Sequence, residues 1–206
     1  MPTDFKTSET RENLMRAFAG ESQARNRYTF AAEVAHRQKQ KIVEDLFTFT
    51  ANQERAHAKV FYDLLQEFSG ENIEISSASY PINISENLED LLNFAKHNEF
   101  EEANDVYLKF SQKAGEEGFQ KVAYTFAEIA KVEQVHCDRF EKLAELLKTN
   151  NLYTTSTSSA WICVNCGYIF EGTNVPLKCP VCLYEQGYFI SVDLLSCKDF
   201  LKGKSK

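Results

Sequence analysis

The sequence has no long hydrophobic run, few glycines and no strongly basic segment. Its apolar stretches fall far short of the roughly 20 residues that a membrane-spanning helix needs. The first 14 residues lack the apolar core of a secretory signal peptide, so we expect a cytoplasmic protein. Only 8 of 206 residues are glycine. None forms the G-x-G-x-x-G pattern that binds a dinucleotide, so this chain is not expected to bind NADH itself.

Basic charge is scarce in the larger part of the chain. Residues 1–148 contain 18 Lys and Arg against 26 Asp and Glu, whereas residues 149–206 contain 5 against 4. An acidic region without a basic stripe argues against nucleic acid as a partner. The 6 cysteines, without a signal sequence, indicate a reducing compartment in which thiols bind metal or stay free.

Four segments carry apolar residues alternately three and four positions apart, a pattern that predicts helices. They span about residues 7–37, 41–68, 86–114 and 119–147. The connections are short, long and short, which is typical of two antiparallel helix pairs joined by a crossover. We therefore predict a mainly α protein with a ferritin-like four-helix bundle over residues 1–148.

The rest of the chain differs in composition. Residues 149–160 are polar and without periodicity, and we interpret them as a linker. An extended linker of this length reaches roughly 40 Å, enough to place the C-terminal segment on a neighbouring subunit. Residues 161–206 are too few to form a stable hydrophobic core without a cross-link or a bound metal, so we predict a small separate metal domain.

Acidic residues lie at mid-length on the apolar side of every predicted helix. Two helices carry Glu-x-x-His, with Glu54 and His57 in one and Glu133 and His136 in the other. A spacing of three places both side chains of a motif on one face. A single such Glu usually extends its carboxylate to solvent. Four helices with acids at matching depth would instead bury charge at a cost of several kcal/mol each, so we infer that cations bind there.

Helix-bundle di-metal sites take one Glu from each of two helices and Glu-x-x-His from each of the other two. The remaining helices supply Glu21 and either Glu99 or Glu102, one acid more than this template needs. The surplus carboxylate is available for ligand exchange. Five carboxylates bring −5 against +4 from two divalent ions or +6 from two trivalent ions, so charge stays nearly balanced in both oxidation states. Oxygen-rich ligation with two imidazoles suits iron or manganese better than zinc.

Two C-x-x-C pairs, twelve residues apart, come after the linker. This spacing is typical of two hairpins that place four thiolates around one metal ion. The four cysteines are Cys163, Cys166, Cys179 and Cys182. Spacing alone favours structural zinc, but aromatic neighbours such as Trp161, Tyr168 and Phe189, and an oxidisable site upstream, favour a redox-active iron. Cys137 and Cys197 lie outside the motifs and are interpreted as free thiols.

These motifs in this order, with C-x-x-C-G-Y and C-P-x-C at the end, resemble the rubrerythrin family over nearly the whole chain. The phrases AGESQARNRY at 19–28 and EEGF at 116–119 agree with it. The resemblance implies a ferritin-like di-iron domain, a rubredoxin-like domain with one iron, and reduction of hydrogen peroxide to water in anaerobes or microaerophiles. It also implies an NAD(P)H-dependent reductase or a rubredoxin as electron donor, and a homodimer or higher homo-oligomer.

The resemblance further implies roles for the ligands. Glu54 and Glu133 would bridge the two irons. The terminal ligands would be Glu21 on one iron and Glu99 and His136 on the other. A redox-linked exchange would swap Glu102 for His57 on the first iron. Two tyrosines near the family's site are matched here by Tyr28 and Tyr107.

Two features depart from the family. After Cys182 the chain reads LYEQGYF in place of a short His- or Pro-containing segment, and it continues through residues 190–206.

An alternative function is ferroxidase and iron storage, as in ferritin-like relatives, but a storage cage has little use for an attached one-electron relay. A zinc-ribbon interaction module on a structural bundle is a third reading, and the seven candidate ligands on the helices argue against it.

Overall fold

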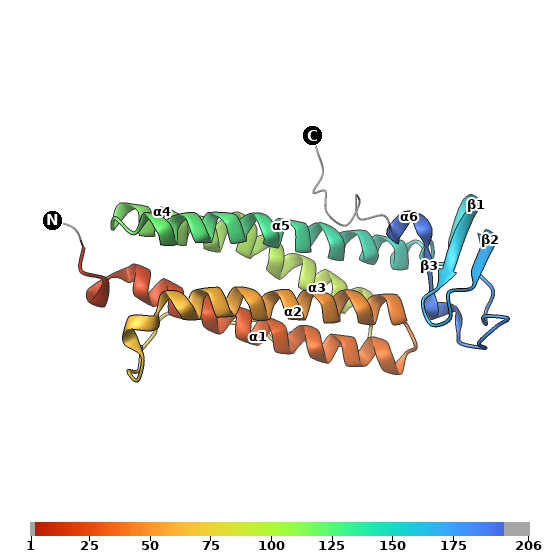
Figure 1. The fold of residues 1–206 in the computed structure, drawn as a ribbon, viewed down its shortest axis with the longest axis horizontal. Helices are drawn as coiled ribbons and strands as arrows, with labels where there is room; N and C mark the ends of the chain where they lie inside the picture. The colour runs from red at the N-terminus through yellow and green to blue at the C-terminus, as the bar shows by residue number, and fades with distance from the viewer. Residues whose placement is uncertain (1–2, 196–206) are drawn as a thin grey trace.

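Two long antiparallel helices form the first half of a bundle (Figure 1). They are α1 (Glu9–Arg37) and α2 (Lys41–Leu64), with a short 3-10 turn at Phe5–Thr7 before them and another at Gln66–Phe68 after them. Ser8 caps α1 by accepting a hydrogen bond from the backbone N–H of Arg11. Lys39, with φ 60, adopts the left-handed conformation that reverses the chain between α1 and α2. This computed structural model describes residues 3–195.

The second half of the bundle contains a π-helical segment that the sequence did not predict. α3 (Leu88–Glu101) passes through the π-helix at Glu102–Val106 into α4 (Tyr107–Glu116), and this rod packs on α5 (Gln120–Lys148). We expected one regular helix over 86–114. A π-helical turn inserts one extra residue per turn and rotates the helix beyond it, and periodicity of apolar residues does not reveal it. The crossover, residues 69–87, joins the two halves as expected.

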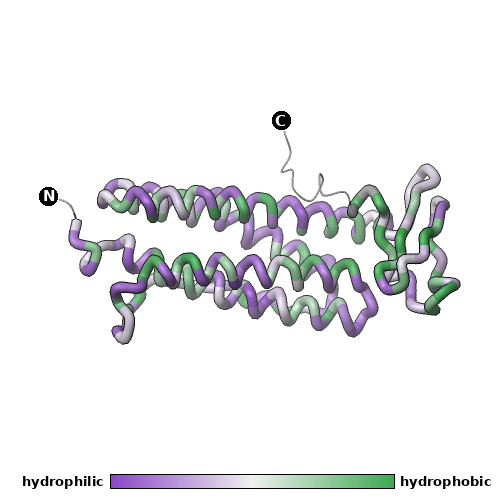
Figure 2. Tube along the Cα trace, in the orientation of Figure 1, coloured by the Kyte–Doolittle hydropathy of each residue, from purple (hydrophilic) through white to green (hydrophobic). Residues whose placement is uncertain are grey.

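The bundle core consists of two apolar clusters. One, rich in aromatic contacts, includes Tyr28, Phe47 and Phe140 with the alanine- and leucine-rich ends of α1, α3 and α5. The other surrounds Phe61 and Phe126 toward the opposite end. Fully burying one such ring contributes about 1.5–3 kcal/mol. Figure 2 shows hydrophobic and hydrophilic residues alternating along each helix, as expected for helices with one buried face. The predicted four-helix, ferritin-like bundle is confirmed.

A small antiparallel sheet comes after the bundle. β1 (Thr154–Cys163) lies between β2 (Ile169–Asn174) and β3 (Phe189–Ser191), with a 3-10 turn at Gln186–Tyr188 and a short α6 (Val192–Leu195). Trp161 is buried in the centre of this unit, where it pairs with Phe170 on one side and Ser191 on the other. Its indole N–H donates to the carbonyl of Gly172, which satisfies its polar atom.

The structure differs from the expected linker over residues 149–160. β1 begins at Thr154 and pairs with β2, so more than half of this segment is strand. The prediction missed this strand because residues 156–158 are all exposed, so apolar and polar residues do not alternate there as in a half-buried strand. The threonines of the segment nevertheless favour an extended backbone. The proposed domain boundaries stay a prediction. Within residues 3–195, no helix combines the length and apolar character needed to cross a membrane.

Candidate metal centres

Four glutamates from four helices form a buried layer between the two apolar clusters. Each is 0% exposed; they are Glu21 on α1, Glu54 on α2, Glu99 on α3 and Glu133 on α5. An uncompensated carboxylate in such a place costs several kcal/mol, so four together require cations or protons. The structure thus brings together the acids that the sequence placed at matching depths.

Two histidines complete the layer. The Nδ1 atom of His57 lies 2.9 Å from Glu133 Oε1 and 3.7 Å from an oxygen of Glu21 and of Glu54. The Nδ1 atom of His136 lies 2.8 Å from Glu133 Oε2 and 3.0 Å from Glu54 Oε1. Possible ligand atoms fall into two groups, each within 4.8 Å: Glu21, Glu54, His57 and Glu133; and Glu54, Glu99, Glu133 and His136. The groups share Glu54 and Glu133.

The arrangement of these atoms fits two adjacent cations. Both oxygens of Glu54 and of Glu133, and Nδ1 of both histidines, have no partner in hydrogen-bond geometry, although N···O distances are as short as 2.8 Å. The atoms therefore aim at common points between the side chains. A donor set of carboxylate oxygens with one imidazole in each group suits iron or manganese.

Without cations, protons must compensate the buried charge. Burial, reinforced by the charge of Glu54, raises the pKa of Glu99 to about 8. Burial also raises the pKa of Glu21 well above its ordinary value, with the charges of Glu54 and Glu133 adding to the effect. Burial opposes protonation of His57, but the negative charge of Glu133 outweighs it and raises the pKa of that imidazole. Metal ions must therefore displace protons from this layer.

Glu102, the surplus acid, lies outside both groups of ligand atoms. It is half-buried and begins the π-helical segment, three positions after Glu99. Burial, reinforced by the charge of Glu99, raises its pKa well above the ordinary value. Of the seven candidate ligands, six therefore converge in this structure and Glu102 stands beside them. π-helical turns occur frequently at functional sites.

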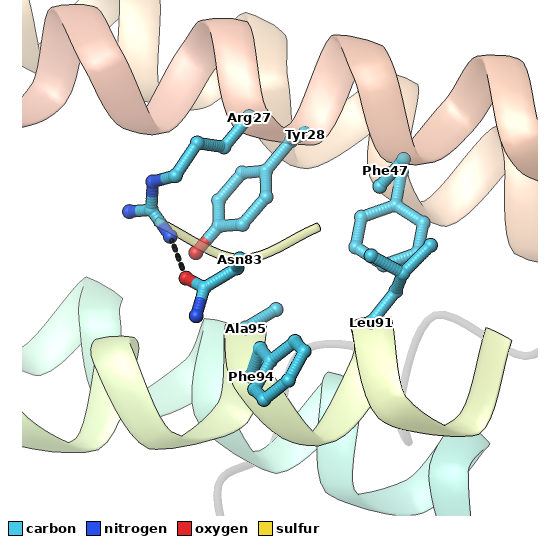
Figure 3. A pocket seen from close by; sticks show the side chains of 8 residues that line it. Arg27, Tyr28, Phe47, Asn83, Leu91, Phe94 and Ala95 are labelled. Carbon is cyan, nitrogen blue, oxygen red and sulfur yellow. Dashed lines mark hydrogen bonds between the residues drawn. The ribbon is translucent and has the colours of Figure 1, made fainter. Parts of the chain in front are cut away.

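Two buried tyrosines contact the layer. Tyr28 on α1 donates a hydrogen bond to Glu99 on α3, and Tyr107 on α4 donates one to Glu21 on α1. Figure 3 shows the surroundings of Tyr28, where Asn83 of the crossover accepts a 2.9 Å hydrogen bond from Arg27. The same oxygen of Asn83 accepts a 2.8 Å bond from Asn98 on α3. Sequence reasoning missed Asn83 because a crossover residue has no periodic context.

Gln53 is a second residue that sequence reasoning missed. Its side-chain oxygen lies 3.0 Å from Nε2 of His136 and accepts a 2.9 Å hydrogen bond from Arg139. This oxygen can only accept, so Nε2 of His136 donates its N–H to Gln53, and Nδ1, which faces the carboxylates, is the ring atom that a metal ion would take. Metal-binding histidines commonly donate their second ring N–H in this way. The only sign of this role in the sequence is that Gln53 directly precedes Glu54.

A groove reaches this region from the surface. Its volume is about 690 Å³, and it lies between α1, crossover residues 77–81 and the α3–α4 rod. Glu102 and Tyr107 are among the residues that line it, together with Asn98 and Val106. The groove thus gives solvent and small molecules a route toward the side of the layer where Glu102 stands.

The four cysteines of the C-terminal unit also converge. The Sγ atoms of Cys163 and Cys182 are 3.7 Å apart, and those of Cys166 and Cys179 are 3.6 Å apart. A disulfide would need about 2.05 Å. A tetrahedral site with metal–sulfur bonds of about 2.3 Å has edges of about 3.8 Å. All four Sγ atoms lie within 4.8 Å of one another, so the predicted tetrathiolate geometry is present.

The two cysteine hairpins differ in one residue. The backbone N–H of Gly167 bonds to the carbonyl of Cys163, and that of Leu183 bonds to the carbonyl of Cys179. Both Gly167 (φ 79) and Leu183 (φ 64) adopt the left-handed conformation, which favours glycine. A side-chain hydrogen bond from Asn165, with the N–H of Tyr184, lowers the pKa of the Cys182 thiol to about 6.

Comparison with known proteins places these two centres in one family. A family model described as "Rubrerythrin" matches residues 12–144 and 90–160, and one described as "Rubrerythrin, rubredoxin-like domain" matches residues 161–190. The chain belongs to the rubrerythrin family. It is 43% identical to rubrerythrin-1 of Clostridium acetobutylicum over 90% of this chain and 95% of that protein. It is 37% identical to rubrerythrin of Nitratidesulfovibrio vulgaris, with the same coverage.

Solved structures agree with this rubrerythrin fold. The fully reduced, all-ferrous state of nigerythrin superposes with a TM-score of 0.59 at 28% identity, covering 92% of each chain. Bacterioferritin of Desulfovibrio desulfuricans, at 20% identity, gives a TM-score of 0.61 over 69% of this chain and 82% of that one, a likeness of fold alone. Rubrerythrins are di-iron oxidative-stress proteins. The chain accordingly has a carboxylate–histidine di-iron site and four cysteines for a tetrathiolate iron.

Among the described residues, Cys137 belongs to none of the groups of ligand atoms. Cys137 is buried in α5 next to His136, and burial raises the pKa of its thiol to about 11, as for a packed, unreactive cysteine. Cys197 lies outside the described residues.

Proposed function

We propose that this chain is a peroxidase that reduces hydrogen peroxide to water with electrons relayed from its tetrathiolate iron to its di-iron centre. Two electrons and two protons convert one peroxide molecule into two water molecules. The observation that carries the proposal is the presence, in one chain, of a buried carboxylate–histidine layer and a four-thiolate site. Iron held by these carboxylates, histidines and cysteines would supply the electrons at both places, since it changes oxidation state where zinc does not.

The proposed bridging ligands are Glu54 and Glu133. Their membership of both groups of ligand atoms supports this role. The proposed terminal ligands are Glu21 on one side and Glu99 and His136 on the other. The donor atoms of His57 and Glu21 lie in the same group, which supports His57 as the exchanging ligand on the Glu21 side.

Glu102 is the carboxylate that we propose to alternate with His57. Its position beside the layer, at the start of the π-helical segment, supports this role, since such segments occur frequently at functional sites. Burial, reinforced by the charge of Glu99, raises the pKa of this carboxyl group and so favours its protonated form while it is outside the layer. The groove that Glu102 lines is the proposed route for peroxide, and this carboxyl group is the proposed first proton donor.

The tyrosines and Gln53 hold the ligands in place in this proposal. Tyr28 and Tyr107 each donate to one carboxylate oxygen, so the other oxygen stays available to metal. Gln53 fixes the tautomer of His136. The apolar clusters on both sides exclude water from the layer, except along the groove.

Rapid mixing tests the proposal against ferroxidase and iron storage. The fully reduced, iron-loaded chain is mixed with peroxide or with dioxygen, and oxidation is followed by absorption. A peroxidase reacts much faster with peroxide and stops after the stoichiometric electrons are consumed. Faster reaction with dioxygen, with accumulation of a mineral core, would show that the protein handles iron instead. A colourless, zinc-loaded C-terminal site would rule out the proposed electron relay from the four cysteines.

The proposed electron donor is a separate NAD(P)H-dependent reductase or a rubredoxin. The absence of a G-x-G-x-x-G pattern from the sequence supports a separate reductase. We further propose a homodimer or higher homo-oligomer, a cytoplasmic location, and division of the chain into a di-iron bundle (1–148) and an iron domain (161–206) whose first strand extends back to Thr154, into the segment (149–160) expected as a linker. Analytical ultracentrifugation of the iron-loaded protein tests the oligomeric state.

A further inference from the structure

The C-terminal unit touches the turn between α1 and α2 with its own backbone. A Cβ atom added to Gly187 would lie 1.9 Å from the carbonyl oxygen of Lys39 and 3.2 Å from the Cα atom of Gln40. Real Cβ atoms do not approach other atoms to within 3.0 Å, and both neighbours here are backbone atoms. Any side chain at this position would therefore push the two surfaces apart.

Position 187 requires glycine because of its close contact with the α1–α2 turn and not because of its own backbone conformation. Gly187 is buried and is not one of the glycines with positive φ, which are Gly70, Gly118 and Gly167. An alanine at position 187 would thus meet no conformational penalty of its own. Its cost would come entirely from the approach of the α1–α2 turn.

Contacts on both sides of the cysteine motifs reinforce this position. Lys39 pairs with Glu185, two positions before Gly187, and Tyr153 donates a hydrogen bond to Gln40 from the start of the unit. Leu152 and Ile190 belong to the same apolar cluster as the adjoining ends of α1, α2 and α5. We refer to Lys39 and Gln40 as the docking turn. Domains joined only by polar contacts usually move relative to each other, whereas here apolar contact and close backbone approach combine.

The contact is connected to the cysteines by short backbone links. The residue after Gly187, Tyr188, accepts a 2.8 Å hydrogen bond from Val164, which is next to Cys163 in the chain. The next residue, Phe189, pairs with Cys163 across the sheet. A displacement of Gly187 from the docking turn would therefore carry the metal-binding end of β1 with it.

We propose that Gly187 is a positioning residue that fixes the four-cysteine site relative to the helix bundle, and so sets the rate of electron transfer between the two iron centres. The inference rests on the relay in the proposed function. Gln40 and Glu54 are 14 positions apart, so the docking turn lies roughly 20 Å along α2 from the carboxylate layer. Electron tunnelling falls off exponentially with distance. The docking turn fixes the position of the four-cysteine site, which is the electron donor. This holds whether the acceptor is the carboxylate layer of the same chain or that of a second copy.

Substitution of Gly187 in the full, iron-loaded chain tests this role. Gly187→Val is compared with Gly115→Ala, a control at a glycine where the new Cβ meets only Ala123, at 3.9 Å. Each reduced protein is mixed with peroxide, and reoxidation of the tetrathiolate iron is followed by visible absorption. We expect Gly187→Val to keep its iron content and spectrum but to reoxidise more slowly by a factor of roughly ten, and the control to stay within about twofold. Hydrogen exchange at residues 149–153 should accelerate in Gly187→Val alone.

Three outcomes are informative. An unchanged reoxidation rate in Gly187→Val, with faster exchange at 149–153, would overturn the proposal. If Gly187→Val loses its thiolate–iron spectrum, the double variant Lys39→Ala/Tyr153→Phe weakens the same contact without touching the unit's backbone, and an unchanged rate there overturns the proposal equally. If peroxide fails to reoxidise the tetrathiolate iron of the unmodified protein, the proposed function itself is wrong, and hydrogen exchange still reports whether Gly187 holds the unit in place.

Discussion

Tyr107, at the start of α4, donates its hydroxyl hydrogen to Glu21 on α1, 86 positions earlier. The reciprocal bond runs from Tyr28 on α1 to Glu99 on α3. Each half of the bundle thus orients one carboxylate of the other half. Because these carboxylates have no exposure to solvent, loss of a tyrosine hydroxyl would leave a buried carboxylate oxygen without its donor.

Removal of the Tyr107 hydroxyl should weaken metal binding. In Tyr107→Phe, Glu21 loses the donor that fixes its orientation, and we expect affinity for divalent metal to fall roughly 10- to 100-fold. Titration with Fe(II) or Co(II) under anaerobic conditions measures the loss. Tyr124→Phe, at a tyrosine 67% exposed on α5, is the control and should bind as the unmodified protein does. Equal affinities in both variants would contradict the proposed orienting role.

Gln53 should matter for the same reason on the His136 side. Gln53→Leu leaves the Nε2–H group of His136 without its acceptor, so we expect a comparable, roughly 10- to 100-fold loss of metal affinity. Gln53→Glu restores an acceptor and should recover most of it. Asn52→Ala, at the exposed neighbouring position, is the matched control. If Gln53→Leu binds metal as well as Asn52→Ala does, the tautomer of His136 is fixed by something else.

Metal binding should release protons and strengthen as pH rises. Burial and the charge of Glu54 raise the pKa of Glu99 to about 8, so this group is largely protonated in the metal-free protein at pH 7. A raised pKa means that the proton must leave before metal binds, so affinity should increase from pH 6 through pH 8, and it should continue to rise above pH 8 because Glu21 and His57 also have raised pKa values. Calorimetric titration in two buffers of different ionisation enthalpy counts the protons. A pH-independent affinity would show that Glu99 is already ionised.

Loss of Glu54 should empty the bundle site alone. This carboxylate belongs to both groups of ligand atoms, so Glu54→Ala should abolish binding of both metal ions. The four cysteines share no residue with that layer, and the thiolate–iron absorption should remain. Metal analysis with a visible spectrum checks both points. Disappearance of the thiolate–iron absorption as well would mean that the two centres do not load independently.

Leu183 offers a stabilising substitution. Its φ of 64 places a bulky side chain, 69% exposed, in the left-handed region that glycine occupies in the first hairpin. Leu183→Gly should therefore stabilise the C-terminal unit by about 1 kcal/mol, since the strain outweighs the small loss of contact. Gly167→Ala should destabilise it by a similar amount. Urea unfolding, followed by the thiolate–iron absorption, measures the change in stability of both variants. A change of the same sign in both would disprove this explanation.

The sequence predicted those features that repeat or obey metal-ligand spacing. Helical periodicity located the bundle, and Glu-x-x-His spacing identified side chains that the structure brings within ligand distance. The four cysteines were recognisable from two short motifs. The features that escaped prediction depend on single contacts between distant segments, such as Gln53 with His136, or Gly187 with Lys39. The π-helix at Glu102 escaped because one extra residue leaves the apolar pattern almost unchanged.

The carboxylate layer divides the apolar core of the bundle into two clusters that do not support each other directly. Metal ions join them, and each ion that binds only the folded chain adds free energy of folding that grows with its concentration. A cell short of iron would then hold less of this protein, because the metal-free form unfolds more often and is degraded. The proposed reduction of peroxide would thereby scale with the iron supply, the same element whose ferrous form makes peroxide dangerous.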